Sequence, residues 1–265
     1  MTTLTIHQID AFADRPFTGN PAAVMPLDAW LADDVLQAIA EENNLSETAF
    51  LVPDASGEAD YELRWFTPTA EVVLCGHATL ASGHFVLGQD AGLDRVMFRT
   101  RKAGLLSVER AGKGYELALP AWAPTPKPLP GIVAALGLDG GVETLWHANR
   151  YGLIVVEHAD VVQGLHPDFR ALARDGDVLT IVTAPGEDAD VISRVFAPGA
   201  GIDEDPVTGS AHAVMVPYWT ARLGRDSFTA FQASKRGGRL DCRLEGDRVV
   251  LGGGCVTVLE GVFRL

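Results

Sequence analysis

The sequence predicts an α+β protein made of two similar domains, and an internal repeat is the first reason. The stretch 66–79 (FTPTAEVVLCGHAT) reappears in degenerate form as the stretch 196–212 (FAPGAGIDEDPVTGSAH). Each copy begins with Phe-x-Pro-x-Ala, passes through a short acidic segment, and ends in a small-residue turn before an apolar helical run. The two copies begin 130 residues apart, about half of the 265-residue chain. A period of that length indicates a duplicated domain rather than a solenoid of short repeats.

A proline-rich segment at mid-chain and the strand-rich pattern on both sides of it are the other two reasons. Residues 120–130 hold five prolines, which is typical of a linker. We therefore expect an N-terminal domain over 1–119 and a C-terminal domain over 131–265, with room for terminal strands to cross over. Each half has two helical segments among many short strands. We expect mostly antiparallel sheets, each with one helix buried against a curled sheet.

In the first half, alternation of apolar and polar residues predicts the strands, and a period near 3.6 predicts the helices. Leu31, Val35, Leu36 and Ile39 fall at helical spacing, and two aspartates in the first turn complement the helix dipole. A second helix follows the small-residue turn of the repeat. The expected strands cover residues 4–12, 22–27, 45–52, 61–66, 95–98, 105–108 and 115–119.

The second half begins with a short helix over 132–136. Its long helix covers 209–223 and begins within the second copy of the repeat. Three glycines at 252–254 lie between two expected strands, which favours a bulge or turn over a phosphate cradle. No dinucleotide-binding fingerprint, P-loop or Gly-x-Ser-x-Gly elbow occurs in the sequence. The expected strands cover residues 144–149, 152–156, 178–183, 190–196, 228–232, 238–244, 248–252 and 256–263.

Composition and charge exclude several classes of protein. Hydrophobic residues make up 47% of the chain and charged residues 21%, so the chain can build a core and disorder is excluded. A net charge of −14 argues against a nucleic-acid surface, which needs a basic stripe, and is typical of a soluble protein. No secretory signal and no membrane-length apolar run is present. Three unclustered cysteines favour a reduced, cytoplasmic protein.

Glu47 is the first candidate for catalysis. Alternation in its strand places it on the same face as Leu45, Ala49 and Leu51. A carboxylate among apolar neighbours is costly to keep charged, which suits a general acid/base. The alternatives are an edge-strand glutamate that points to solvent, or one that pairs with an arginine such as Arg64.

Residues 75–77 (Cys-Gly-His), here named the first helix start, form the second candidate. Gly76 permits close backbone approach, and N–H groups at a helix start bind carboxylates or stabilise an enolate. His77 could donate to a substrate or relay a proton, or simply satisfy a backbone carbonyl. Cys75, His77 and His84 suggest a metal site, but the two histidines lie about 10 Å apart by helix rise, so we expect no metal.

Residues 208–210 (Thr-Gly-Ser), here named the second helix start, follow a run of three acids at 203–205. Such a run is usually a solvated loop, but here it leads into hydroxyls that cap a helix or bind a ligand. Asp205, which is held before a proline, could act as a second acid/base or as an orienting group. Two helix starts that face each other would form a cleft for a small carboxylate-bearing substrate.

The chain resembles the phenazine-biosynthesis PhzF-like isomerase family. The resemblance covers nearly the whole chain in order, and its motifs together are highly specific. Besides both copies of the repeat, the matching stretches are IDAF at 9–12, FTGNPAAV at 17–24, NLSETAF at 44–50, RWFTP at 64–68 and DEDPVTGSA at 203–211. The resemblance implies the diaminopimelate epimerase-type fold: two duplicated domains, each a barrel-like, mostly antiparallel sheet around a central helix.

The resemblance also implies a site and a chemistry. The active site would lie between the domains of a homodimer and work without cofactor or metal. The acid/base glutamate of the family falls on Glu47 and its helix-start histidine on His77, while its loop aspartate falls on Asp205 and its serine on Ser210. The implied reaction removes a proton beside a carbonyl or alkene and returns it elsewhere. The residues expected to bind substrate are Asn20, Ser46, Gly76, Thr208 and Gly209.

Two alternatives to this isomerase stay open. The wider fold includes amino-acid epimerases that use one cysteine from each domain as opposed bases. Cys75 lies at the first helix start, but the second has Asp205, Thr208 and Ser210 and no thiol. A two-thiol racemase is therefore disfavoured, and an epimerase that uses Glu47 opposite another group stays possible. The other alternative is a non-catalytic binding protein that kept the cleft.

Overall fold

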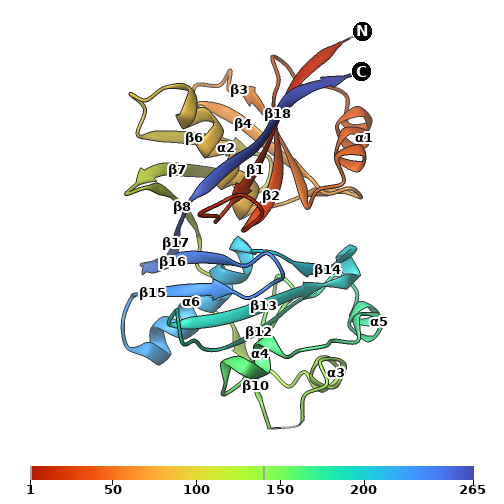
Figure 1. Cartoon of the computed structure of the whole chain (residues 1–265), viewed down its shortest axis with the longest axis vertical. Coiled ribbons are helices and arrows are strands. Elements are labelled where there is room, and N and C mark those ends of the chain that lie inside the picture. The colour runs from red at the N-terminus through yellow and green to blue at the C-terminus, as the bar shows by residue number, and fades with distance from the viewer. Residues whose placement is uncertain (1, 140) are drawn as a thin grey trace. The chain divides into compact units, whose positions relative to one another are not determined.

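The computed structural model describes residues 2–139 and 141–265, which fold into two compact units (Figure 1). The first unit contains residues 2–118 together with Gly252–Leu265, and the second contains Leu119–Leu251. The final strand therefore belongs to the first unit. No helix in the described residues is long and apolar enough to cross a membrane.

The sheet of the first unit begins with the C-terminal strand at one edge. The strand order is β18 (Cys255–Arg264), β1 (Thr3–Ala11), β2 (Asn20–Pro26), β3 (Glu47–Pro53), β4 (Tyr61–Phe66), β6 (Arg95–Thr100), β7 (Leu105–Ala111) and β8 (Gly114–Pro120). The β2–β3 and β4–β6 pairs are parallel and the others antiparallel. A two-residue strand, β5 (Glu71–Val72), adds to the end of β4.

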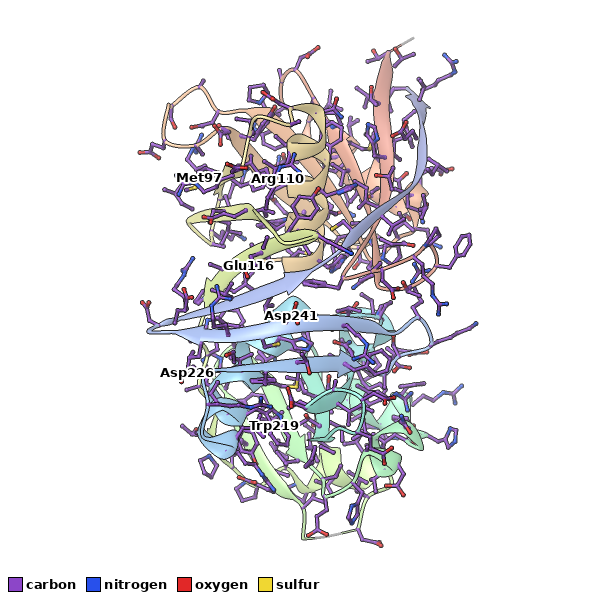
Figure 2. All side chains as sticks on the ribbon, turned by 60° about the vertical axis from the view of Figure 1, so that its left-hand side comes forward. Met97, Arg110, Glu116, Trp219, Asp226 and Asp241 are labelled. Atoms are coloured by element: carbon purple, nitrogen blue, oxygen red, sulfur yellow. The ribbon has the colours of Figure 1, made fainter. Side chains whose placement is uncertain are left out.

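Helix α2 (Gly76–Gln89) is the central element of the first unit. It contacts β1, β2, β3, β6 and β7, so the sheet curls around it. Its sequence, GHATLASGHFVLGQ, is apolar or small on nearly every side, which is typical of a helix buried on all faces. Arg110 of β7, which is labelled in Figure 2, donates to the Leu87 carbonyl. This bond satisfies a terminal carbonyl of α2. A second helix, α1 (Asp33–Asn43), buries Leu36, Ile39 and Ala40 against β2 and β3.

The second unit repeats this plan. Its strand order is β9 (Thr125–Pro126), β10 (Glu143–His147), β11 (Tyr151–Val155), β12 (Leu179–Pro185), β13 (Val191–Ala197), β15 (Ser227–Gln232) and β16 (Gly238–Glu245). Strand β14 (Ile202–Asp205) adds to β13, and β17 (Arg248–Gly253) follows β16 in the chain. Buried Trp219 anchors helix α6 (Gly209–Leu223) by donating to Thr183 of β12 (Figure 2). The short helices are α3 (Pro130–Ala135), α4 (Ala159–Gln163), α5 (Phe169–Leu172), η1 (Ala173–Asp175) and η2 (Pro198–Ala200).

The two units share one local topology around the central helix. In the first, β3 pairs with β4, β5 adds to β4, α2 follows, and β6 returns parallel to β4. In the second, β12, β13, β14, α6 and β15 repeat the same sequence of pairings, including the parallel return of β15 beside β13. The α+β class and the epimerase-type fold inferred from the sequence are thereby confirmed.

The elements agree with the sequence expectation in part. The helix expected over 209–223 has those bounds as α6, but other segments differ. The acidic run 203–205, expected as a loop, lies in strand β14, and the linker contributes the short strand β9. The glycines at 252–254 end β17 and bring the backbone against Phe12 and Ala13, where a Cβ on Gly254 would meet a carbonyl oxygen at 2.5 Å.

Close packing of α2 against β7 predicts opposite effects for two glycine substitutions in one helix. A Cβ on buried Gly83 would lie 2.3 Å from Cγ1 of Val108, whereas one on Gly88 would meet nothing within 4 Å. We expect Gly83→Ala to destabilise the protein by roughly 1–3 kcal/mol through overpacking, which outweighs the better helix propensity of alanine. Gly88→Ala should stabilise by up to about 1 kcal/mol.

Urea unfolding midpoints of the two variants and the wild type check this pair. Both substitutions add the same methyl group to the same helix, so the difference between them isolates the contact with Val108. Equal shifts in the two midpoints would contradict the packing described here.

Candidate active site

Glu47 is placed by the turn that follows α1. Asn44 ends the helix in the left-handed conformation (φ 48°), and the chain then enters β3 with Glu47 as its first residue. Parallel pairing sets Glu47 opposite Ala22, two residues after Asn20 in β2. The Glu47 side chain is 13% exposed, so most of it is buried. Ser46, which precedes it, is half-buried.

The first helix start meets Glu47 directly. Nε2 of His77 lies 3.0 Å from Oε2 of Glu47, and Nδ1 of His77 lies 3.1 Å from Nδ2 of Asn20. The Cys75 sulfur lies 3.5 Å from the same Nδ1. Strands β2 and β3 and the beginning of α2 thus bring together four side chains. Of the expected site residues, Asn20, Glu47, Gly76 and His77 gather here.

Each ring nitrogen of His77 faces a polar side chain. Nδ1 lies against the side-chain amide of Asn20, and Nε2 lies against the Glu47 carboxylate. The Glu47–His77 contact is close, but neither Oε2 nor Nε2 makes a well-aligned hydrogen bond within the described residues. Buried polar atoms normally have such partners. The two atoms are thus in contact at 3.0 Å without completing a hydrogen bond of good geometry.

Burial and charge shift the pKa values of this group. Burial, with a contribution from the Glu47 charge, raises the pKa of the Cys75 thiol to about 11. Cys75 is therefore a neutral thiol at neutral pH. Burial by itself disfavours the imidazolium form of His77, but the contacts of His77 with Cys75 and with the Glu47 carboxylate outweigh burial and raise the pKa of His77 above its usual value. His77 is thus a better proton acceptor than a core histidine.

Glu47, Cys75 and His77 also offer an oxygen, a sulfur and a nitrogen within 4.8 Å of one another. The carboxylate, however, approaches Nε2 and the thiol approaches Nδ1. One ion takes only one ring nitrogen, so the arrangement suits proton transfer along a chain better than chelation. His84 does not join the group, because its ring nitrogens contact Tyr115 and Thr257, each at 3.0 Å.

The second helix start carries a hydrogen-bonded group of a different kind. The Thr208 hydroxyl donates to Asp205, and the Thr208 N–H donates to Gln232 at 2.8 Å. The amide of Gln232 in turn donates to the Asp205 carbonyl oxygen at 2.7 Å. Ser210, in the first turn of α6, is half-buried. Sequence reasoning found Asp205, Thr208 and Ser210 but missed Gln232, a fully buried residue of β15.

A buried or mostly buried arginine precedes each helix start in the sequence. Arg64 of β4 forms a two-pronged ion pair with Glu71 of β5 at 2.7 and 2.9 Å, and its guanidinium lies over the Phe66 ring. Arg64 also donates to Asp33. Because Arg64 has these partners, the alternative in which it pairs with Glu47 is wrong. The Arg64 hydrogen bond, set against burial, holds the pKa of Glu71 below its usual range.

The second unit contains the same clamp. Arg194 of β13 pairs with Glu204 of β14 at 2.7 and 2.9 Å, and its guanidinium lies over Phe196. We call Arg64–Glu71 and Arg194–Glu204 the Arg–Glu clamps. Sequence reasoning missed both, although both arginines precede the Phe-x-Pro-x-Ala runs by two residues. Extending the alignment of the two copies two residues further upstream would have found both arginines.

A further equivalence lies one turn into each helix. Thr79 donates to the Cys75 carbonyl at 2.6 Å, and His212 donates through Nδ1 to the Thr208 carbonyl at 2.8 Å. His212 is fully buried, and its Nε2 has no hydrogen-bond partner among the described residues. Burial lowers the pKa of His212 to about 4, against the smaller opposing effect of its bond to Thr208.

Fold and site together define a duplicated, epimerase-type α+β protein with a buried carboxylate–imidazole pair at a helix start. Comparison with known proteins supports that class. The model of the family described as phenazine biosynthesis-like protein matches residues 9–261. The chain belongs to this family.

Relatives of known name agree with this membership. An uncharacterized isomerase of Pseudomonas aeruginosa is 49% identical over 99% of both chains. The crystal structure of a PhzF-family phenazine biosynthesis protein from Enterococcus faecalis is 41% identical, covers 100% of both chains and superposes with a TM-score of 0.90. A hydroxyproline epimerase from Agrobacterium vitis, 13% identical with a TM-score of 0.62 over 98% of this chain and 92% of its own, shares the fold alone.

Breaking the clamp in the first unit should destabilise the protein. Glu71→Gln leaves the buried Arg64 guanidinium, 1% exposed, without its two-pronged partner. We expect a loss of roughly 3 kcal/mol, as for other buried ion pairs that lose one member. Glu109→Gln is the matched control, because its pair with Arg95 is exposed and 3.9 Å long. That control should change stability by less than about 1 kcal/mol. Equal denaturation midpoints for the two variants would contradict the role given to the clamp.

Burial of His212 predicts a pH-dependent stability. The pKa of His212 is about 4 in the folded protein and about 6.5 in the unfolded chain. Between these pH values the unfolded chain binds a proton at this residue and the folded protein does not. The favourable contribution is complete above pH 6.5 and is lost as the pH falls towards 4, by roughly 3 kcal/mol. Unfolding free energies of wild type and His212→Gln from pH 4 to 7.5 measure it. If the difference between the two proteins is constant across this range, the prediction is wrong.

Proposed function

We propose that this protein is a cofactor-independent isomerase that moves a proton on a small carboxylated metabolite, with Glu47 as the general acid/base. The observation that supports this most is the close contact of Glu47 with His77, in which two buried polar atoms lack an aligned hydrogen bond. A carboxylate and an imidazole that lie 3.0 Å apart can transfer a proton between them. A substrate that forms a hydrogen bond to either group could then exchange a proton with the pair.

The two helix starts carry the partial positive charge of a helix N-terminus, which can stabilise the negative charge that builds up during proton removal. Neither Cys75 nor Thr208 caps its helix with its side chain, so the first N–H groups of α2 and α6 are available to oxygens of a substrate. Proton removal beside a carbonyl or alkene builds negative charge, which aligned N–H donors stabilise. Gly76 and Gly209, without side chains, let a substrate approach these donors.

The remaining roles follow from the family resemblance. Asp205 and Ser210 complete the catalytic set with Glu47 and His77. Asn20, Ser46 and Thr208, beside the two glycines, bind substrate. A cytoplasmic homodimer in a biosynthetic pathway is part of the same proposal.

Glu47 is a better base than Cys75 for this reaction. A thiol with a pKa of about 11 is almost entirely protonated at neutral pH, and its thiolate is the reactive form. No thiol stands at the second helix start to serve as the opposed partner of Cys75. The one observation that favours an epimerase of an amino or hydroxy acid is that Cys75 lies 3.5 Å from His77. Chiral analysis of the product distinguishes an epimerase from a positional isomerase.

Glu47→Gln should abolish turnover and leave folding intact. Loss of a positioned acid/base typically lowers kcat by about 10²–10⁴. We would follow deuterium uptake by NMR in deuterium oxide, over a panel of dihydroanthranilates and small amino and hydroxy acids. Uptake with wild type and none with Glu47→Gln is the expected result, and unfolding midpoints of both proteins check the fold.

Cys75→Ser is the matched control, because it changes the other proton-bearing group in contact with His77. Under the proposed mechanism this variant still exchanges deuterium. An active Glu47→Gln beside an inactive Cys75→Ser would reverse the assignment and favour the thiol-dependent epimerase. Binding of a panel compound without any exchange would point to a non-catalytic binding protein.

A further inference from the structure

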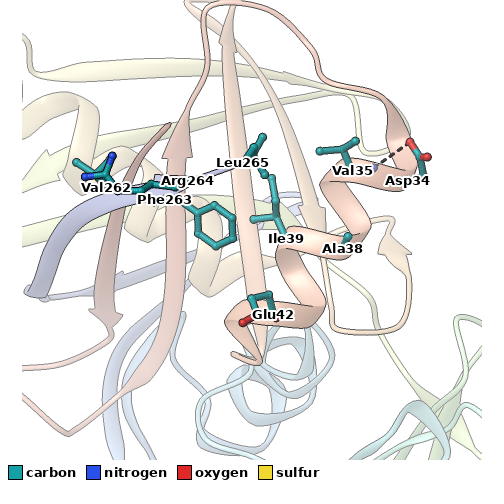
Figure 3. Close-up of a pocket in the computed structure, with 9 residues that line it drawn as sticks. All are labelled: Asp34, Val35, Ala38, Ile39, Glu42, Val262, Phe263, Arg264 and Leu265. Carbon is teal, nitrogen blue, oxygen red and sulfur yellow. Dashed lines mark hydrogen bonds between the residues drawn. The ribbon is translucent and has the colours of Figure 1, made fainter. Parts of the chain in front are cut away.

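Different helices cover the two faces of the sheet in the first unit. Phe50 and Phe66 pack in a cluster with Ile39 of α1, so the even-numbered residues of β3 and β4 face α1. A hollow of about 730 Å³ lies on this face, between α1 and β18, and Ile39 helps to line it (Figure 3). The odd-numbered residues face α2 instead, because Glu47 of β3 contacts His77 of α2. The hollow is therefore no part of the Glu47 group.

Trp65 of β4 lies on the α2 face, close to Glu47. It pairs with Ala49 of β3, two residues after Glu47, so Trp65 and Glu47 are diagonal neighbours on one face. Such neighbours lie about 7–8 Å apart, within reach of an aromatic side chain. On its other side Trp65 pairs with Val72 of β5, three residues before Cys75. Trp65 therefore lies between the strand that carries Glu47 and the segment that leads to the first helix start.

The indole N–H of Trp65 is buried without an acceptor. Trp65 is 2% exposed, and its Nε1 has no hydrogen-bond partner among the described residues. Trp30 shows the usual arrangement, since it donates to Glu62 at 2.9 Å. Trp219 likewise donates to Thr183 at 3.1 Å. An indole nitrogen can only donate, and an unpaired donor in the interior costs free energy, so the position of Trp65 indicates an acceptor from outside the chain.

The second unit shows that the fold does not require an indole at this place. Alignment of the two Arg–Glu clamps sets Trp65 against Val195, which is fully buried. Val195 pairs with Asp205 of β14, as Trp65 pairs with Val72 of β5. Each unit thus has one polar side chain in this strand pair. In the second unit it is Asp205, which belongs to the proposed catalytic set, and in the first it is Trp65.

We propose that the indole N–H of Trp65 donates a hydrogen bond to an oxygen of the substrate whose reacting carbon lies against Glu47. The inference rests on the proposed function, because it concerns the same substrate and the same site. Oε2 of Glu47 and Nε2 of His77 are buried, as is Nε1 of Trp65. A substrate that reaches the first two atoms therefore enters the interior on the face where Trp65 lies.

The surroundings of the indole narrow the class of substrate. Ala49 and Leu51 are fully buried on the same face as Trp65, so a hydrogen bond there forms in apolar surroundings. A single neutral donor suits a carbonyl or hydroxyl oxygen, whereas the N–H groups at the helix starts suit a carboxylate. The substrate is thus a carboxylated compound with a further carbonyl or hydroxyl oxygen on an apolar carbon skeleton.

NMR titration of the wild-type protein tests this contact. Each of the five tryptophans gives one indole N–H signal, so Trp65 can be followed in the full chain. A substrate from the deuterium-exchange panel should shift the Trp65 signal downfield. The signals of Trp30 and Trp219, whose N–H groups already have acceptors, should stay in place. If no compound of the panel shifts the Trp65 signal, the inference is overturned, whether or not exchange occurs.

Trp65→Phe removes the donor and keeps an aromatic ring. The panel compound that binds wild type should bind this variant about 10-fold more weakly, as for the loss of one hydrogen bond. The unfolding midpoint should stay close to that of wild type, because no acceptor in the described residues loses a bond. Trp30→Phe is the matched control, since it removes an indole N–H of the same unit that donates to Glu62, and it should leave binding unchanged.

The outcomes separate this contact from the chemistry at Glu47. A Trp65→Phe variant that folds and binds as tightly as wild type would overturn the inference and leave the proposed isomerase standing. A compound that shifts the Trp65 signal but never exchanges deuterium would support the contact and count against the isomerase alone. If Trp65→Phe fails to fold, the titration of wild type decides by itself.

Discussion

In each unit, an arginine that is buried or mostly buried pairs with a glutamate between the end of a sheet strand and the beginning of the central helix. Arg64 and Arg194 pack over Phe66 and Phe196, and each binds a glutamate on the short strand that follows. A guanidinium that is nearly inaccessible to water needs such a partner, because an unpaired charge in that position would cost several kcal/mol. The clamp therefore fixes the path of the connection and, through it, the position of the helix start.

The contact between His77 and Glu47 depends on the position of the first helix start. Cys75 and His77 lie in the few residues between the clamp and the body of α2, and a small displacement there would separate His77 from Glu47. The helix itself tolerates little movement, because its small residues bring the strands close on several sides. A rigid helix with an uncapped beginning pre-organises N–H donors, which is where electrostatic stabilisation of developing charge is most effective. The close packing of α2 thus both stiffens the sheet around it and fixes the N–H groups at its first turn.

The features predictable from sequence were those carried by local pattern. The duplicated Phe-x-Pro-x-Ala run and the apolar stretch after each copy indicated two domains with central helices, and alternation around Glu47 indicated a shielded carboxylate. Contacts between residues distant in sequence carry no such pattern. Gln232 lies 24 residues after Thr208 and reaches it only because β15 returns beside β13. Strands β5 and β14 are too short to show a period, and each carries the glutamate of a clamp.

The duplication has kept the backbone and changed the chemistry. Both helix starts retain the clamp and the side-chain bond one turn into the helix, but the first presents a thiol and an imidazole, whereas the second presents two hydroxyls beside Asp205. Of the two helix starts, the first contains a buried imidazole, His77, that contacts a mostly buried carboxylate, Glu47. A protein that only binds an anion gains nothing from burying a carboxylate at such a point, since its charge opposes the ligand and its burial is costly. The contact of Glu47 with His77 thus supports the proposed proton transfer more than a role in binding alone.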